Sequence, residues 1–291
     1  MSYPRAVIVV TGTRRAGTSM WMQILAAAGY SVIGERFPGG WATSLRAANP
    51  DGFYESLLRN GVYYRTNPHP ETGEYASPEE SRRHAVKVFL PGLIKSDRAY
   101  LDHVIATVRP WRAYVASLRR LYALEDANRA GGDADEPPPR MPPGLEWWED
   151  HYALLRDLAI RRYPCHVQSY ERLLADPRGV IGRVLAWLGD GGDVEAAVAV
   201  VRDRPPAREE EDAAIGPAEA EVFDALHEAI ARGEGIDRAL LERMNALHEQ
   251  LEPRIIAHRD AIARARGLPV LPREVADDGP FAALVDWEAP L

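Results

Sequence analysis

The sequence predicts a three-layer α/β domain with a central parallel sheet, followed by a helical C-terminal extension. Strand-like and helical segments alternate over residues 1–190, which is typical of a parallel sheet covered by helices. The strand candidates are short β-branched runs without polar alternation, as expected where both faces of a sheet are buried. Two long helical stretches follow, at residues 217–232 and 236–266.

The first unit has the order strand, loop, helix. Residues 6–10 are the strand candidate, residues 12–17 the loop, and residues 18–28 a helix that ends at Gly29, a residue favoured after helix C-termini. Further strands are expected at 31–33, 85–90, 104–108 and 167–170, and further helices from Pro110 to about Asp126, at 145–162 and from Asp176 to near Gly189.

Two segments are expected to be irregular. Residues 128–144 contain five prolines and three glycines, which predicts a flexible exposed loop. Residues 203–216 form a charged loop, and the proline-containing tail after residue 266 is expected to lie along the surface. We therefore divide the chain into an α/β domain at 1–202 and a helical extension with its tail at 203–291, packed on the same domain.

Composition limits the classes of partner. The net charge of −8 makes the surface as a whole a poor match for nucleic acid or anionic lipid, so a polyanion would need cations concentrated at one site. Cys165 is the single cysteine, which excludes an intrachain disulfide or a Cys-rich zinc site and fits a reducing, cytoplasmic location. No uncharged apolar run is long enough for a membrane span.

The loop after the first strand has the frame of a phosphate-binding loop. Residues 12–19 read G-T-R-R-A-G-T-S and match G-x-x-x-x-G-K-[ST], except that Thr18 takes the place of the lysine. Glycines allow close backbone approach to an anion, and the following helix adds the positive end of its dipole. Arg14 or Arg15 can clamp one phosphate or sulfate, whereas the missing lysine disfavours a triphosphate. The prediction is a P-loop-type domain; the alternative is a glycine-rich turn with solvated arginines.

The stretch T-R-R-A-G-T-S-M-W resembles the 5′-phosphosulfate loop of sulfotransferases that use 3′-phosphoadenosine 5′-phosphosulfate (PAPS), in particular the bacterial and Golgi-like branch. The resemblance implies that Arg15, Gly17, Thr18 and Ser19 surround the 5′-phosphate and the sulfuryl group. The whole cofactor-binding stretch is then Arg14, Arg15, Ala16, Gly17, Thr18, Ser19 and Met20.

A PAPS site must also hold a 3′-phosphate. Arg109 ends a strand candidate, and Ser117 lies eight residues later, two helical turns along, so both can face one phosphate. The family has a similar Arg-and-Ser motif. The segment V-Q-S-Y-E-R-L-L-A-D-P resembles another family segment and implies that Tyr170 lies near the adenine. A plain strand-to-helix turn and a core tyrosine are the alternatives. The family's usual C-terminal motif is missing, so residues 203–214 are expected to complete the pocket.

Three residues are candidates for the chemistry. The segment K-V-F-L-P resembles K-T-H-L-P of the cytosolic enzymes, so Lys87 matches the lysine that contacts the transferred group, while Phe89 replaces the histidine base. The segment N-P-D-G-F-Y-E-S resembles a bacterial sulfotransferase segment, which implies that Glu55 is the base. The alternative is that Glu55 only begins a helix. Arg15 and Lys87 would stabilise the developing charge.

Other residues are weaker candidates. His69, His84 and His151 are alternative bases, and Trp147 and Trp148 resemble a family helix that could wall the acceptor pocket. Surface or structural histidines and core tryptophans are the alternatives.

The sequence therefore predicts in-line sulfuryl transfer from PAPS to a hydroxyl of a small-molecule or peptide acceptor, without a metal. The alternatives are a P-loop kinase or NTPase using ATP and Mg²⁺, and a non-catalytic relative that binds nucleotide. The acceptor and the oligomeric state are not determined by the sequence.

Overall fold

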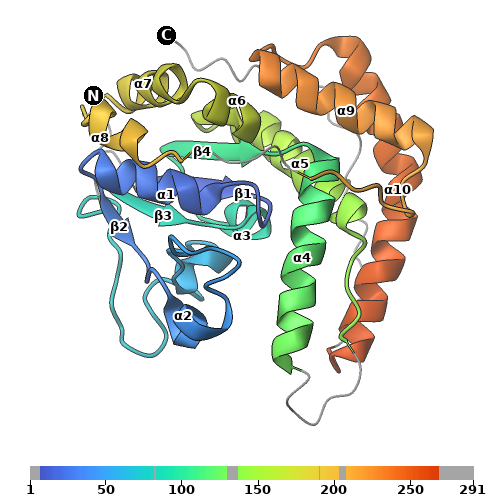
Figure 1. Ribbon diagram of the computed structural model, residues 1–291, viewed down its shortest axis with the longest axis horizontal. Helices are drawn as coiled ribbons and strands as arrows, with labels where there is room; N and C mark the ends of the chain where they lie inside the picture. The colour runs from blue at the N-terminus through green and yellow to red at the C-terminus, as the bar shows by residue number, and fades with distance from the viewer. Residues whose placement is uncertain (1–6, 82, 130–136, 190, 203–207, 269–291) are drawn as a thin grey trace.

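The computed structural model describes residues 7–81, 83–129, 137–189, 191–202 and 208–268. A sheet of five parallel strands lies at the centre, in the order β2-β3-β1-β4-β5 (Figure 1). The strands are β1 (Ile8–Gly12), β2 (Ser31–Ile33), β3 (His84–Lys87), β4 (His103–Val108) and β5 (Cys165–Ser169). The predicted α/β class with a parallel sheet and C-terminal helices is confirmed.

Ten α-helices and three 3-10 turns lie within the described residues. They are α1 (Thr18–Ala27), α2 (Trp41–Ser44), α3 (Leu90–Lys95), α4 (Trp111–Arg129), α5 (Pro143–Arg161), α6 (Tyr170–Ala175), α7 (Pro177–Leu188), α8 (Val194–Ala199), α9 (Pro217–Arg232), α10 (Arg238–Ala265), η1 (Pro38–Gly40), η2 (Leu57–Asn60) and η3 (Arg98–Tyr100).

Several predicted boundaries are wrong by a few residues. The third strand ends at Lys87, and α3 begins at Leu90, because the proline next to it favours a first helical turn. The predicted loop at 128–144 loses residues at both ends to α4 and α5, and residues 130–136 lie outside the described part. Helices α6 and α8 were not expected; both are six residues long, too short for a clear helical period.

The two faces of the sheet are covered by different helices, which gives the three layers. Ile8 and Val10 of β1 belong to an apolar cluster with α1, α6, α7 and α8, whereas Val7 and Val9 belong to a second cluster with α3, α4, α5, α9 and α10. Side chains of a strand alternate between faces, so a strand buried on both faces shows no polar alternation. This explains the continuous apolar run that predicted β1.

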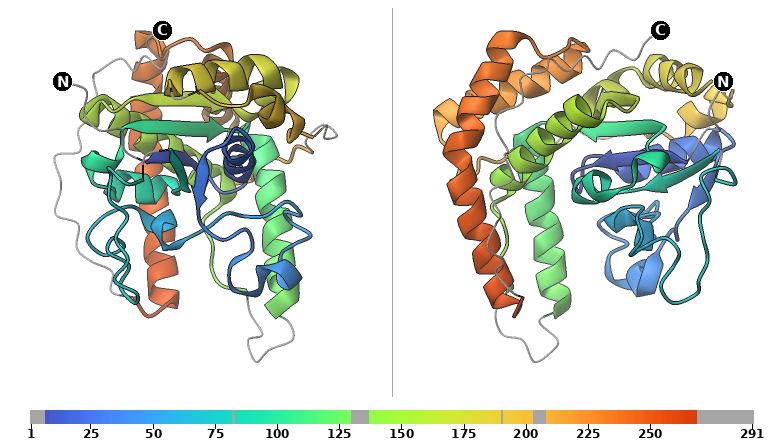
Figure 2. Two further views of the ribbon diagram at one scale, coloured as in Figure 1. Left: turned by 90° about the vertical axis from the view of Figure 1, so that its left-hand side faces the viewer. Right: turned by 180° about the vertical axis from the view of Figure 1, so that it is seen from behind.

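The helical extension continues the second of these layers. Helix α9 packs against β5 and α10, and α10 packs against α5. Figures 1 and 2 show α10 and α4 both extending beyond the sheet on the side of α2. The prediction of 217–232 matches α9, and 236–266 is slightly longer than α10. The predicted surface tail lies outside the described residues, and within them no helix is long and apolar enough to cross a bilayer.

Strand order brings three chain segments together at one edge of the sheet. β1 lies between β3 and β4, and the register pairs Val10 with Lys87 and Gly12 with Thr107. In open α/β sheets, ligands bind outside the carboxyl ends of strands where the strand order reverses. The loop after β1, Lys87 at the end of β3 and Arg109 just after β4 share this position.

Candidate functional site

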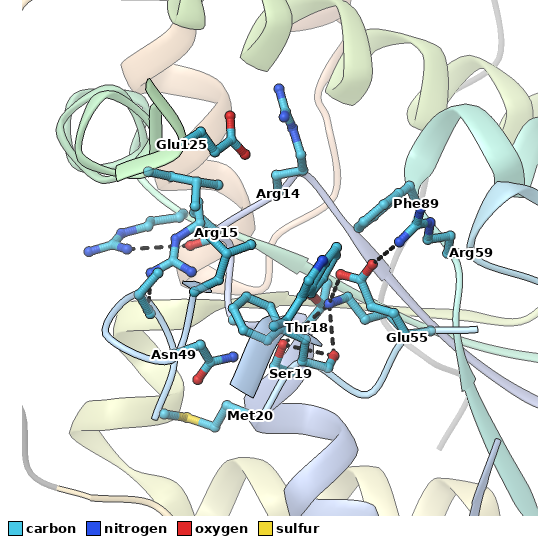
Figure 3. Close-up of a pocket in the computed structure, with 18 of the residues that line it drawn as sticks. Arg14, Arg15, Thr18, Ser19, Met20, Asn49, Glu55, Arg59, Phe89 and Glu125 are labelled. Carbon is cyan, nitrogen blue, oxygen red and sulfur yellow. Dashed lines mark hydrogen bonds and ion pairs between the residues drawn. The ribbon is translucent and has the colours of Figure 1, made fainter. Parts of the chain in front are cut away.

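A pocket of about 650 Å³ opens at the carboxyl ends of β1 and β3. Its walls come from the loop between β1 and α1, the region around α2, the end of β3, and α4 (Figure 3). Among the described residues that line it, six are Lys or Arg and two are Glu. The cations are Arg14, Arg15, Arg59, Lys87, Arg109 and Arg266, and the carboxylates are Glu55 and Glu125. A protein of net charge −8 therefore concentrates positive charge at one pocket, as anion binding requires.

The loop between β1 and α1 is held against the neighbouring strand. Thr107 Oγ1 of β4 donates a hydrogen bond to the Ala16 carbonyl at 2.9 Å. Gly17 has φ +99°, and a Cβ there would lie 2.5 Å from Cδ2 of Tyr170. Only glycine allows this close approach, so the Tyr170 ring supports the loop from behind. Arg15 has φ +70°, an uncommon conformation for a residue with a side chain.

The N-terminus of α1 faces the pocket without a side-chain cap. Gly17 is the N-cap residue, no side chain caps the helix, and the first turn carries no acidic residue. The N–H groups of a first helical turn have no partner within the helix, and the dipole of the helix is positive there. Gly17, Thr18 and Ser19 all line the pocket. This arrangement is suited to an anion.

Lys87 connects the helix N-terminus to a buried carboxylate. Its Nζ lies 2.9 Å from Glu55 Oε1, 3.0 Å from the Phe53 carbonyl and 3.3 Å from Ser19 Oγ. Arg59 Nη1 lies 2.7 Å from the other oxygen of Glu55. We call Ser19, Glu55, Arg59 and Lys87 the Lys87 cluster; Figure 3 shows its ion pairs. The cluster holds two cations against one carboxylate.

Backbone pairing positions Glu55 within the Lys87 cluster. Glu35 N–H donates to the Glu55 carbonyl at 2.9 Å, and Glu55 N–H donates to the Glu35 carbonyl at 3.1 Å. Tyr54, immediately before, has φ +55°. Because successive side chains of an extended segment point to opposite sides, this short bridge and turn fix the direction of the Glu55 side chain. Glu55 is 5% exposed and therefore needs its two cationic partners.

The burial of Lys87 changes its affinity for a proton. Burial lowers the pKa of Lys87 below its ordinary value, because desolvation disfavours the ammonium form more than the Glu55 carboxylate favours it. Arg15 and Arg59 lower it further. An anion bound beside Lys87 would add favourable charge and so favour the protonated form.

Arg109, Arg15, Ser117 and Tyr170 meet on the other side of the loop. Arg109 Nη1 donates to the Arg15 carbonyl at 3.3 Å, and its guanidinium lies 5.2 Å from the centre of the Tyr170 ring. Arg15 Nε donates to Ser117 Oγ at 3.3 Å. Arg109 therefore contacts the backbone of Arg15, whereas Ser117 contacts its guanidinium. Ser117 is 2% exposed and lies behind Arg15, while the other three line the pocket.

Arg14 points away from the helix N-terminus. Its guanidinium bonds to both oxygens of Glu146 on α5, at 3.1 and 3.2 Å, and to Tyr122 Oη on α4 at 2.7 Å. Burial by itself would lower the pKa of Arg14, but Glu146 and Tyr122 raise it above its ordinary value. Of the two loop arginines, Arg14 ties the loop to α4 and α5, whereas Arg15 stays beside Ser117.

Other sequence candidates fall in different places. Phe89 lines the pocket, and its ring lies 5.5 Å from Lys87 Nζ. His69 and His84 do not line it. Trp147, Trp148 and His151 are buried in the core and do not line the pocket, so the expectation that the two tryptophans wall it is wrong. A Trp pair on an amphipathic helix faces the core because large aromatic rings gain most from burial.

Several lining residues were missed by the sequence reasoning. Trp41 and Leu45 come from a weakly helical region, and Arg266 from the end of α10; none stands in a recognisable motif. Arg59 could have been found, since it lies four residues after Glu55, a spacing that suits an ion pair. The segment expected to complete the pocket contributes no lining residue in its described part, 208–214, where Glu210 and Glu211 pair with arginines of α4. Residues 203–207 lie outside the described part.

The two strands that flank β1 lead to cations and not to a carboxylate that could bind a metal ion. The strands on either side of β1 lead to Lys87 and Arg109, not to Asp or Glu. Within the described residues, no group of three or more His, Cys, Asp or Glu side chains could hold a metal ion.

No family model and no curated protein matches the chain. Among solved structures, it is similar to the sulfotransferase domain from the Synechococcus PCC 7002 olefin synthase. The two are 16% identical, the match covers 87% of this chain and 96% of that domain, and the TM-score is 0.38. We base the functional proposal on the motifs and on the pocket described above.

Proposed function

We propose that the protein is a PAPS-dependent sulfotransferase that moves a sulfuryl group to a hydroxyl of a small-molecule or peptide acceptor. The observation that carries the proposal is the Lys87 cluster beside an uncapped helix N-terminus. The helix N-terminus suits a phosphosulfate, and Glu55 of the Lys87 cluster offers a carboxylate to the acceptor. The sequence resemblance supports the same assignment for both groups.

Different residues would bind the 5′-phosphosulfate and the 3′-phosphate of PAPS. The N–H groups at the start of α1 and the hydroxyls of Thr18 and Ser19 would hold the 5′-phosphosulfate. Arg109 and Ser117, on either side of Arg15, would hold the 3′-phosphate. Arg15 lies between the two groups and would have to leave Ser117 when a phosphate takes its place. Tyr170 supports the loop at Gly17 and lies on the adenine side.

The transfer itself needs charge stabilisation and one proton acceptor. The acceptor oxygen forms a bond to sulfur while the bond from sulfur to the bridging phosphate oxygen breaks, and 3′,5′-bisphosphoadenosine leaves with the electron pair. Lys87 and Arg15 would stabilise the negative charge that develops on the leaving oxygen. Glu55 would accept the proton of the acceptor hydroxyl, because Phe89 has no group that can. Lys87 and Arg59 keep the Glu55 carboxylate in place.

The first test compares nucleotides by titration calorimetry. We expect 3′,5′-bisphosphoadenosine to bind clearly more tightly than ATP with Mg²⁺, because the pocket holds cations for two separated phosphates. Tight binding of ATP without binding of the bisphosphate would contradict the proposal and favour a P-loop kinase or NTPase.

The second test asks whether the site is catalytic. Incubation with PAPS and a panel of phenols, sugars, lipids and tyrosine peptides should give an acceptor with the mass gain of one SO₃ group. Bisphosphate binding with no sulfated product from any acceptor, and no effect of Glu55→Gln, would favour a non-catalytic nucleotide-binding relative.

A further inference from the structure

Helix α9 of the C-terminal extension packs directly behind the Arg109 end of the pocket. Phe223 of α9 is fully buried between three tryptophans, with its ring centre 5.8 Å from that of Trp111, 5.2 Å from Trp147 and 5.0 Å from Trp148. We call these four residues the aromatic brace. All are fully buried, so the brace fixes α9 relative to α4 and α5.

The aromatic brace is bonded to the backbone around Arg109. Trp147 Nε1 donates to the Arg109 carbonyl at 2.8 Å. Trp111 Nε1 donates to Asp224 Oδ1 at 2.9 Å, and Arg112 Nη1 donates to both oxygens of Asp224 at 2.9 Å. The turn from β4 into α4 is thus held at Arg109 itself and again two and three residues later.

Asp224 is the polar centre of this attachment. Its carboxylate accepts from a fully buried indole and pairs with Arg112, whose guanidinium also lies 4.3 Å from the centre of the Trp111 ring. A buried indole N–H that loses its acceptor is costly, so the Trp111 ring and its backbone would shift to find another partner. Such a shift would move the start of α4, which lies two residues after Arg109.

Helix α9 also contacts α6, which lies on the other side of the Arg109 side chain. The Arg109 guanidinium lies over Tyr170, and Tyr170 begins α6. Arg172 Nη1 of α6 donates to the Ala231 carbonyl of α9 at 3.2 Å, and His227 Nε2 of α9 lies 3.5 Å from Glu171 Oε2. Helix α9 therefore contacts both elements between which the Arg109 side chain lies.

We propose that Asp224 is a positioning residue for Arg109 in the subsite that holds the 3′-phosphate. The proposal rests on the function proposed above. Asp224 does not line the pocket and would not touch the nucleotide. It acts through Trp111 and Arg112 by fixing the turn that carries Arg109. A long arginine side chain binds a phosphate well only when its backbone and neighbours limit the conformations it must give up.

The test uses two ligands that differ by the 3′-phosphate. Titration calorimetry of the full chain with 3′,5′-bisphosphoadenosine and with adenosine 5′-phosphate gives the contribution of that phosphate as a ratio of dissociation constants. For Asp224→Ala, which removes both acceptor oxygens, we expect bisphosphate binding to weaken roughly three- to tenfold, the range for one ordinary hydrogen bond. Binding of adenosine 5′-phosphate should change by less than about twofold, because the loop at α1 does not contact Asp224.

Glu228→Ala is the matched control, since it removes a carboxylate from an exposed ion pair with Arg232 on the same helix. It should leave both dissociation constants unchanged. If Asp224→Ala does not fold, Arg112→Met removes the ion pair from the other side and keeps the bond from Trp111. An unchanged ratio, or equal weakening of both ligands, would overturn the positioning role and leave Asp224 with a purely structural one.

The outcome for the unmodified protein separates the two proposals. If it does not bind the bisphosphate more tightly than adenosine 5′-phosphate, the proposed function fails, and the role of Asp224 fails with it. If it does, and the variant keeps the same ratio, only the role of Asp224 fails.

Discussion

The Lys87 cluster and the core around the aromatic brace both bury ionisable side chains, but they do so in opposite ways. In the Lys87 cluster, the carboxylate of Glu55 is buried between two cations. In the layer of the brace, His151 is 1% exposed, packs on Trp147, and has a pKa lowered to about 4 because burial disfavours its charged form. At the pocket, Glu55 keeps its charge because it is paired with cations, whereas in the core burial favours the neutral form of His151.

This difference indicates where function and where stability lie. Ion pairs between buried groups contribute little net stability, so a buried charged cluster at a pocket is better explained by chemistry than by folding. A neutral histidine among tryptophans serves packing. Substitutions in the Lys87 cluster should therefore change turnover, and changes near the brace should alter stability or ligand affinity.

The largest effect is expected at Lys87. We expect Lys87→Met to lower kcat roughly 10³-fold, because it removes a positioned cation from the site where charge develops. The loss of the ion pair also leaves Glu55 with Arg59 alone, so the free energy of unfolding should fall by less than the roughly 3–5 kcal/mol expected for a buried carboxylate without any cation. Product formation measured by mass spectrometry and a thermal melt report the two effects.

Lys95→Met is the control for Lys87, since it removes an exposed lysine at the end of α3. If Lys87→Met does not fold, Lys87→Arg keeps the charge and should retain more of the turnover. An unchanged kcat in folded Lys87→Met would place the chemistry away from the Lys87 cluster.

Glu55→Gln should have the next largest effect. The amide keeps the shape of the side chain but cannot accept a proton, so kcat should fall roughly 10²-fold. Binding of 3′,5′-bisphosphoadenosine should change little. A lower kcat with unchanged bisphosphate binding is the result that assigns the loss to proton acceptance.

Glu35→Gln changes a carboxylate on the partner strand of the same short bridge and serves as the control for Glu55. A Glu55→Gln enzyme that keeps the wild-type kcat would exclude Glu55 as the base.

The brace layer should instead give a pH dependence of stability. The pKa of His151 is lowered to about 4 in the folded protein, whereas an unfolded histidine titrates near its ordinary value of about 6.5. Between these values the unfolded chain binds more protons, so stability is lost as pH falls through this window, by about 3 kcal/mol in total for His151. Denaturant unfolding at pH 7, 6 and 5 measures the loss.

His151→Asn keeps a donor for the Trp147 carbonyl, which accepts from His151 Nδ1, but it cannot titrate, so the acid-dependent loss should become smaller. His258→Asn on α10 is the control. If the stability of the His151 variant depends on pH as strongly as that of the wild type, then His151 is not the source of the loss in acid.

The smallest effect is expected at Ser117. Its hydroxyl accepts one hydrogen bond from Arg15 and is buried behind it. We expect Ser117→Ala to weaken bisphosphate binding roughly threefold to tenfold, the range for one hydrogen bond, and to leave kcat within about twofold. Calorimetry on Ser117→Ala and on the exposed Ser31→Ala of β2 compares the two. A larger loss of kcat than of affinity would contradict this prediction and would connect Ser117 directly to the transfer chemistry.

The sequence by itself determined the parallel α/β fold and the order of its elements, because buried strands and amphipathic helices have local periods that a single chain displays. It also determined the loop at residues 12–19, whose glycines and following helix lie close together in the chain. The two long helices of the extension could be predicted for the same reason. The short helices α6 and α8 could not, since six residues hold less than two helical turns.

Only the tertiary structure decided which side chains meet. Arg14 and Arg15 are neighbours in sequence, yet one pairs with Glu146 on α5 and the other bonds to Ser117 on α4. Glu55 and Lys87 are joined across 32 residues, and Asp224 is joined to Trp111 across 113. Long-range pairs depend on strand order and on helix packing, which no local pattern contains, and they place Lys87, Glu55 and Arg109 at one edge of the sheet.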